Sequence, residues 1–166
     1  PCGFDPAEFA PMDQAAAHPA LMGLARQAFI DECGAALCHK YHRLGDSLFT
    51  PTGFQQYADD LLHRMVNPYL CDPVVRVIRD PQRKLGWDDR LFGTMRLVLA
   101  QGFLPKALAR GAAAGVRYLL QTTGGLNQAV NRQDFESVLL RLWQIPAPTP
   151  ETTTLVNLTW EAMQTS

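Results

Sequence analysis

Apolar residues recur at intervals of three and four along most of this chain, which is the spacing that places them on one face of an α-helix. The first such stripe runs from Leu21 to Leu37. Pro19 suits the first turn of a helix, and Gly45 suits the position after its last turn. We therefore predict one long helix from Pro19 to about Gly45, bent near Gly34.

The same periodicity predicts further helices, and no stretch shows the alternation of period two that a strand requires. Thr50 and Pro51 suit the N-cap and first position of the second helix, and Thr149-Pro150 starts the last one. The further helices are expected at approximately residues 51–66, 74–79, 88–102, 105–120, 134–143 and 150–163. The fold class is therefore predicted to be all-α, a single domain of about seven helices.

Two stretches fall outside this helical pattern. Residues 1–18 contain several prolines and a run of alanines, and are expected to form an extended lead-in that ends near His18. Residues 121–131 contain Gly124 and Gly125 and are expected to form a loop. Residues 19–166 are then expected to form the helical domain.

Composition supports a folded domain and argues against two classes of partner, nucleic acid and membrane. Of the 166 residues, 47% are hydrophobic and 19% are charged, a balance typical of a soluble domain with its own core. The net charge of −1, from 16 acidic and 15 basic residues, argues against nucleic acid as a partner, because neutralising phosphates needs a basic surplus. No apolar run approaches the roughly 20 residues that span a bilayer, and no signal peptide is recognisable, so no membrane partner is expected.

The cysteines form neither a CxxC pair nor the spacing of a disulfide framework, and are expected to be reduced thiols in a cytoplasmic protein. They are Cys2, Cys33, Cys38 and Cys71. Cys38, His39 and His42 are close enough on a helix to bind zinc, but a structural site needs four ligands. Only distant residues, among them His63, would complete the set. Packing or surface placement is therefore the preferred interpretation, and no metal is expected.

The stretch from Asn67 to Leu91 concentrates basic residues on a backbone that prolines interrupt. Its basic residues are Arg76, Arg79, Arg83, Lys84 and Arg90. In a helix, Arg76, Arg79 and Arg83 share one face, with Val75 and Ile78 on the other. Such a group suits an anion, because arginine binds phosphate through paired N–H donors. The alternative is a structural network in which the basic residues pair with Asp72, Asp80, Asp88 and Asp89. Both interpretations stay open.

Recognisable catalytic motifs are missing from the chain. Gly124-Gly125 lacks the preceding strand and the spacing of a dinucleotide-binding loop, and there is no Walker loop, no GxSxG and no HExxH. Trp87, Trp143 and Trp160 lie at helix starts or on apolar faces and are interpreted as core or junction residues.

The basic stretch resembles a known family through the segments NPYL, DPVVRVIRDPQRKL and DRL, preceded by YADDLLHRMVNP and followed by GFLPKALARGAAAG. The run ARQAFIDECGAAL resembles the helix that opens the same domain. Together these segments are similar, over about residues 18 to 120, to the C-terminal helical domain of the mannitol-1-phosphate dehydrogenase and mannitol dehydrogenase family of polyol-specific long-chain dehydrogenases.

This resemblance implies the fold of the C-terminal domain of 6-phosphogluconate-dehydrogenase-like enzymes. It also implies a role on the substrate side of an NAD-dependent oxidoreductase that interconverts a polyol phosphate and a sugar phosphate, such as mannitol 1-phosphate and fructose 6-phosphate. In that family a separate N-terminal Rossmann domain binds NAD. That domain is absent from this chain, which is not expected to bind NAD alone.

The resemblance also implies site residues. Arg76 and Lys84 match positions that approach the substrate's hydroxyls or phosphate, and Arg79 and Arg83 are the next candidates. The family's catalytic Lys-Asn-His motif, K-x5-N-x2-H, is not found here, so no catalytic residue is assigned and the chain alone is expected to be inactive. An alternative from another class is a free-standing helical module that kept the fold and binds a metabolite or a protein partner without catalysis.

Overall fold

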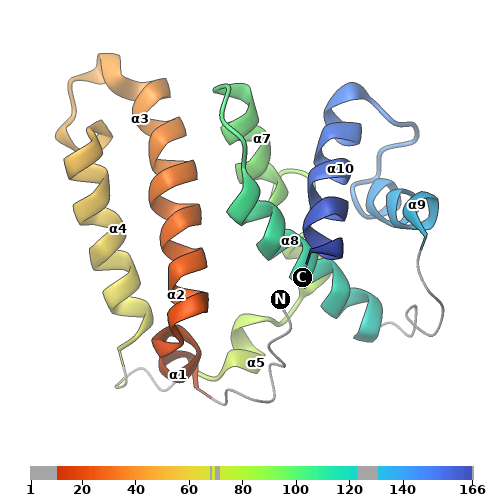
Figure 1. The fold of residues 1–166 in the computed structure, drawn as a ribbon, viewed down its shortest axis with the longest axis horizontal. Coiled ribbons are helices and arrows are strands. Elements are labelled where there is room, and N and C mark those ends of the chain that lie inside the picture. The colour runs from red at the N-terminus through yellow and green to blue at the C-terminus, as the bar shows by residue number, and fades with distance from the viewer. Residues whose placement is uncertain (1–10, 68, 70–71, 123–130, 166) are drawn as a thin grey trace. The chain divides into compact units, whose positions relative to one another are not determined.

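A computed structural model describes residues 11–67, 69, 72–122 and 131–165 of the chain (Figure 1). These residues are helices joined by turns and contain no strand, apart from an isolated backbone pairing between Pro11 and Pro73. The all-α prediction is therefore confirmed. Contacts group the described residues into two compact units, which are treated separately below. The N-terminal unit comprises described residues of 11–79 with 98–107, and the C-terminal unit comprises 80–97 with 108–165.

The N-terminal unit is built on the predicted long helix, which runs without a break from Pro19 to Tyr41. Its three parts are α2 (Pro19–Arg26), the π-helical segment η1 (Gln27–Gly34) and α3 (Ala35–Tyr41). The wider turns of η1 end at Gly34, where the sequence predicted a bend. The short 3₁₀ turn η2 (His42–Leu44) then ends at Gly45, whose φ of +68° is the left-handed conformation that favours glycine.

A second helix, α4 (Pro51–Met65), follows the 3₁₀ turn η3 (Ser47–Phe49) and lies beside the long helix within the same unit (Figure 1). The predicted start is confirmed, because the Thr50 hydroxyl accepts a hydrogen bond of 3.1 Å from the Gly53 amide. The two helices approach closely at Gly34: a Cβ there would lie 2.7 Å from Cδ1 of Phe54. The unit's core at this contact uses small side chains, since Ala36 and Ala58 are fully buried.

Two short helices complete the described N-terminal unit. Residues 12–17 form α1 (Met12–Ala17), so the expectation of an extended lead-in is wrong for these residues. The alanine run is the physical reason, because alanine has the highest helix propensity. The rest of that lead-in, residues 1–10, lies outside the described residues. The backbone amide of Met12 donates to the Asp72 carbonyl at 2.8 Å, just before α5 (Val74–Val77).

Five helices belong wholly or mainly to the C-terminal unit. They are α6 (Pro81–Lys84), α7 (Phe92–Ala100), α8 (Lys106–Thr122), α9 (Arg132–Leu142) and α10 (Pro150–Gln164). The predicted start of α10 is confirmed, and a capping box forms there, since Thr149 and Thr152 each accept the other's backbone N–H. The prediction that Asp88 begins the next helix is wrong: α7 begins at Phe92, and the Asp88 carboxylate binds an arginine instead.

The core of the C-terminal unit is formed by large apolar side chains that are fully shielded from solvent. They are Phe92, Met95, Val116, Phe135, Leu139, Leu155 and Val156. Each such side chain contributes roughly 1.5–3 kcal/mol by its burial. Helices α9 and α10 contact each other through the rings of Phe135 and Trp160, which are tilted by 55° with centroids 5.2 Å apart. This core is the support for the part of the basic segment that lies in the same unit.

Candidate anion-binding segment

The predicted site residues lie on two short helices rather than on one. Arg76 belongs to α5, which ends at Val77, and Arg83 and Lys84 belong to α6, which begins at Pro81. Because proline interrupts the helical backbone, Arg76, Arg79 and Arg83 do not share a continuous helical face. The division between the two compact units also falls here, between Arg79 and Asp80. Arg76 and Arg79 therefore belong to the N-terminal unit, and Arg83 and Lys84 belong to the C-terminal unit.

In the N-terminal unit, Arg76 and Arg79 are both exposed. A nitrogen of Arg76 lies 3.0 Å from the Asp72 carboxylate, four residues earlier, and 70% of the Arg76 side chain is accessible to solvent. The Arg79 guanidinium has no ion pair or side-chain hydrogen bond within the part of the chain that the structure describes. The sequence placed Val75 and Ile78 opposite the arginines; in the structure Val75 is 63% exposed, and Val74 is the buried residue of α5.

In the C-terminal unit, Asp80 shapes the turn that leads into α6. Its backbone has φ +61° and ψ +58°, a left-handed conformation that aspartate tolerates better than most residues. Its carboxylate accepts hydrogen bonds from the Arg83 backbone amide at 3.4 Å and from the Arg83 side chain at 2.9 Å. The side-chain hydrogen bond from Arg83, together with the charges of Arg83 and Lys84, holds the pKa of Asp80 below its ordinary value.

Arg83 lies between two carboxylates. Beside its contact with Asp80, it has a nitrogen 3.5 Å from the Asp89 carboxylate, and 55% of its side chain is exposed. Lys84 is half-buried at the end of α6. The structural network that the sequence left open is therefore present around Arg76 and Arg83.

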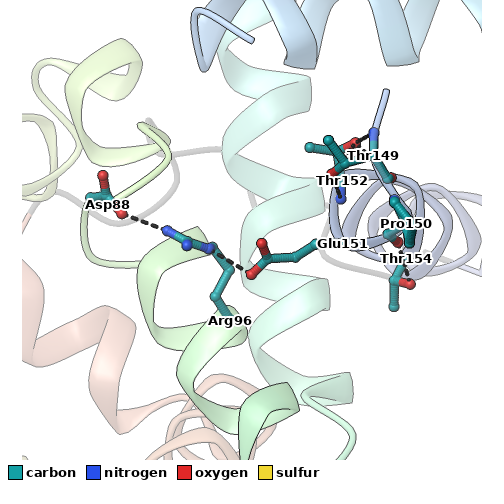
Figure 2. Close-up of polar contacts among 7 residues, drawn as sticks. All are labelled: Asp88, Arg96, Thr149, Pro150, Glu151, Thr152 and Thr154. Atoms are coloured by element: carbon teal, nitrogen blue, oxygen red, sulfur yellow. Dashed lines mark hydrogen bonds and ion pairs between the residues drawn. The ribbon is translucent and has the colours of Figure 1, made fainter. Parts of the chain in front are cut away.

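A further arginine, Arg96 of α7, organises the turn that follows α6 and was not among the predicted residues. Figure 2 shows its guanidinium between two carboxylates, with Nη1 at 2.5 Å from Asp88 and Nε at 2.8 Å from Glu151. The guanidinium also lies 4.0 Å from the ring centroid of Trp87, a cation–π contact. Burial opposes its charge, but hydrogen bonds to Glu151 and Asp88 raise the pKa of Arg96 above its ordinary value.

This cluster joins the turn before α7 to the first turn of α10. Glu151 follows the N-cap Thr149, so its negative charge also lies at the positive end of the α10 dipole (Figure 2). No sequence signal identifies the contact, because Arg96 and Glu151 are 55 residues apart and follow no helical spacing. Arg96 already pairs with two carboxylates, so we interpret the cluster as one that holds this turn.

The histidines and cysteines of the long helix lie in the N-terminal unit. Nδ1 of His42 lies 2.7 Å from the carbonyl oxygen of His39, and the His39 ring lies edge-on to Phe103 with centroids 6.0 Å apart. Burial, with a smaller effect of the neighbouring Glu32 charge, raises the pKa of Cys33 to about 11. The described residues contain no group of three or more His, Cys, Asp or Glu side chains suited to a metal ion. Cys2 and Cys71 lie outside the described residues.

Two further points concern the NAD cofactor and membrane-spanning helices. The resemblance implies NAD as the cofactor of the family. A dinucleotide-binding fingerprint lies between a strand and a helix, and the described residues contain no such strand. Gly124-Gly125 lies outside those residues. Among the helices that the structure describes, none combines the length and the apolar character needed to cross a membrane.

Fold and segment together define an all-α domain with a proline-interrupted basic segment. The profile of the mannitol dehydrogenase C-terminal domain matches residues 14–145. The chain belongs to this family, and the resemblance seen in its sequence is confirmed.

Curated relatives give the same assignment. The mannitol-1-phosphate 5-dehydrogenase of Halalkalibacterium halodurans is 34% identical over 128 residues, which cover 75% of this chain and 32% of the relative. Those of Bacillus subtilis and Caldanaerobacter subterraneus are 36% and 38% identical over 101 and 88 residues, covering 61% and 53% of this chain. The aligned parts cover 24% and 21% of these two relatives. The chain thus spans about a third or less of the length of each relative.

Proposed function

We propose that this chain is the substrate-side domain of an NAD-dependent polyol-phosphate oxidoreductase, and that it binds a sugar or polyol phosphate such as mannitol 1-phosphate or fructose 6-phosphate. Support comes from the family membership and from relatives that carry the name mannitol-1-phosphate 5-dehydrogenase. The partner in catalysis is a Rossmann domain that binds NAD. A cytoplasmic location, where cysteines stay reduced, goes with this function.

The observation that carries the proposal is the exposure of the Arg79 guanidinium and its lack of a neutralising partner among the described residues. A phosphate offers several oxygen acceptors to such a guanidinium, and arginine binds them through paired, charge-assisted hydrogen bonds. Lys84, a compact ammonium on a long flexible stem, suits the second role of contacting phosphate or hydroxyl oxygens.

Arg76 and Arg83 are proposed to contribute after exchanging partners. Both are paired with exposed carboxylates, and such surface pairs contribute only about 0–1 kcal/mol. A phosphate that carries more charge than a carboxylate can therefore compete with Asp72 or Asp80 at little cost. The phosphorylated substrate is favoured over a free polyol for this reason, because a hydroxyl group could not displace a carboxylate from arginine.

The chain is proposed to be inactive without its partner domain. Polyol oxidation requires a base for the hydroxyl proton and an acceptor for the hydride, which NAD supplies when bound. The family's Lys-Asn-His motif is not found in this sequence, and we assign no base to it. The chain's own residues bind and orient the phosphate and the hydroxyls.

The test is titration calorimetry of the chain with mannitol 1-phosphate, with mannitol and inorganic phosphate as comparison ligands. We expect heat of binding with mannitol 1-phosphate and a loss of about tenfold or more in affinity in Arg79→Ala and Lys84→Ala. Arg141→Ala and Lys106→Ala remove exposed basic residues outside the segment and serve as controls. Equal loss in all four variants would show a non-specific charge effect and contradict the site. Robust NAD reduction by the chain alone would contradict the proposed inactivity.

A further inference from the structure

Leu85 directly follows Arg83 and Lys84 and fixes this part of the chain in the core of the C-terminal unit. Only 1% of the surface of Leu85 is exposed to solvent. Its side chain lies against Gly115 of α8: a Cβ placed at position 115 would be 3.1 Å from Leu85 Cδ2. That distance is tighter than ordinary van der Waals contact, so a glycine at 115 lets the leucine approach the helix backbone. Arg83 and Lys84 are therefore attached to a residue, Leu85, that is fixed in the core.

The backbone of Leu85 is held separately by Trp143, which is 58 residues further along the chain. The Trp143 indole Nε1–H donates to the Leu85 carbonyl oxygen at 3.1 Å, and this hydrogen bond is buried. The indole itself is fixed, because its ring packs edge-on against Phe92 with centroids 4.7 Å apart and beside Trp87 at 5.1 Å. A buried carbonyl that loses its donor finds no water in exchange, so the bond strongly favours one position of the Leu85 backbone.

We propose that Trp143 and Gly115 are positioning residues that hold Leu85, and with it Arg83 and Lys84, in the orientation that meets a phosphorylated ligand. Consecutive Cα atoms are about 3.8 Å apart, so a displacement of the Leu85 backbone also displaces the neighbouring Lys84. The ion pairs of Arg83 with Asp80 and Asp89 are exposed and cannot replace the buried anchor. The ligand part of this inference rests on the proposed function, while the anchoring of residues 81–90 can be tested without a ligand.

The first experiment measures hydrogen exchange in peptides that cover residues 81–90 of the full chain. Trp143→Phe removes the indole N–H and keeps an aromatic ring. Trp160→Phe is the matched control, since Trp160 lies in the same unit but packs against Phe135. We expect exchange in residues 81–90 to be about tenfold faster in Trp143→Phe and unchanged in Trp160→Phe. Unchanged exchange in Trp143→Phe would overturn the anchor, whether or not the chain binds a ligand.

The second experiment measures the Kd for mannitol 1-phosphate well below the melting temperature of each variant. We expect Trp143→Phe to weaken binding about tenfold, Gly115→Ala to weaken it in the same direction, and Trp160→Phe to leave it unchanged. A purely structural role would lower Tm and leave Kd unaltered, which would overturn the positioning. If the unsubstituted chain itself fails to bind, the proposed function and the ligand part of the inference both fall, and hydrogen exchange alone decides the anchor.

Discussion

The carboxylate of Glu32 accepts a hydrogen bond of 2.5 Å from the backbone amide of Ala107, 75 residues further along the chain. Glu32 is 6% exposed and Ala107 is 2% exposed. Ala107 lies in the first turn of α8, where backbone amides have no acceptor within the helix. Glu32 supplies one of these missing acceptors from the π-helical segment η1, and its charge lies at the positive end of the helix dipole.

We expect Glu32→Ala to lower the free energy of unfolding by about 2–3 kcal/mol, because it leaves a buried amide without an acceptor. Glu32→Gln keeps an acceptor oxygen and loses the charge, so its effect should be about half as large. Urea unfolding followed by circular dichroism measures both. Asp31→Ala removes the exposed acidic neighbour and should change stability by less than about 0.5 kcal/mol. Equal losses for the two alanine variants would contradict the capping role.

The close contact between the long helix and α4 can be tested by substituting Gly34, with Gly23 as the control position. Gly34→Ala would place a Cβ 2.7 Å from the buried Phe54 ring, and should destabilise the protein by about 1–3 kcal/mol. Gly23 has no neighbouring atom within 4 Å of such a Cβ, so Gly23→Ala should stabilise by about 0.5–1 kcal/mol through helix propensity. Thermal unfolding measures both, and shifts of Tm in the same direction would show that the contact is not tight.

Asp80 makes a pH-dependent contribution to stability. Its pKa in the folded chain lies below the ordinary value of 3.8, so the stabilisation is present above that value and is lost as pH falls through the lower folded pKa. Asn is compatible with the left-handed backbone, so Asp80→Asn removes mainly the charge. We expect Asp80→Asn to be less stable than the original chain at pH 7, and the difference to shrink below about pH 3.8.

Acid titration of unfolding by circular dichroism measures this difference. Asp60→Asn is the control, because Asp60 is an exposed carboxylate of α4 with no ion pair in the described part of the chain. A stability difference for Asp80→Asn that stays constant from pH 7 to pH 2 would show that Arg83 does not stabilise the carboxylate.

Cys33 is expected to be nearly inert toward alkylation in the folded chain. Burial raises its pKa to about 11, so at pH 8 roughly one molecule in a thousand carries the reactive thiolate. Burial also raises the pKa of Cys38, but by less than it raises that of Cys33. Iodoacetamide labelling followed by peptide mass spectrometry should therefore modify Cys38 first. Labelling of Cys33 should rise as pH approaches 11 and on unfolding in urea; rapid labelling of Cys33 at pH 8 would contradict its burial.

Arg96 is expected to stabilise the C-terminal unit through its two carboxylates and Trp87. Arg96→Ala should lower the free energy of unfolding by about 1–2 kcal/mol, since both carboxylates are partly exposed and solvent screens the pairs. Arg96→Lys should recover only part of this loss, because lysine cannot bridge both carboxylates and stack on the ring. Urea unfolding at two salt concentrations measures the effect. Arg141→Ala is the exposed control, and an equal loss there would contradict the role of the cluster.

Local chemistry explains which features could be predicted from the sequence. Thr50 with Pro51 and Thr149 with Pro150 mark helix starts because the cap and the helix are a few residues apart. The same reasoning missed α1 and α6, two short helices beside prolines. It also could not show that Val74 is the buried residue of α5, because a four-residue helix is too short for periodicity to fix its buried face.

The sequence by itself determined the all-α class, most of the helices and the family, because these depend on periodicity, on local caps and on a contiguous motif. Only the tertiary structure decided which residues far apart in the chain contact one another. The contacts of Glu32 with Ala107, Arg96 with Glu151 and Trp143 with Leu85 join residues 55 to 75 positions apart. Such contacts follow from how helices pack in three dimensions, and no spacing along the chain encodes them.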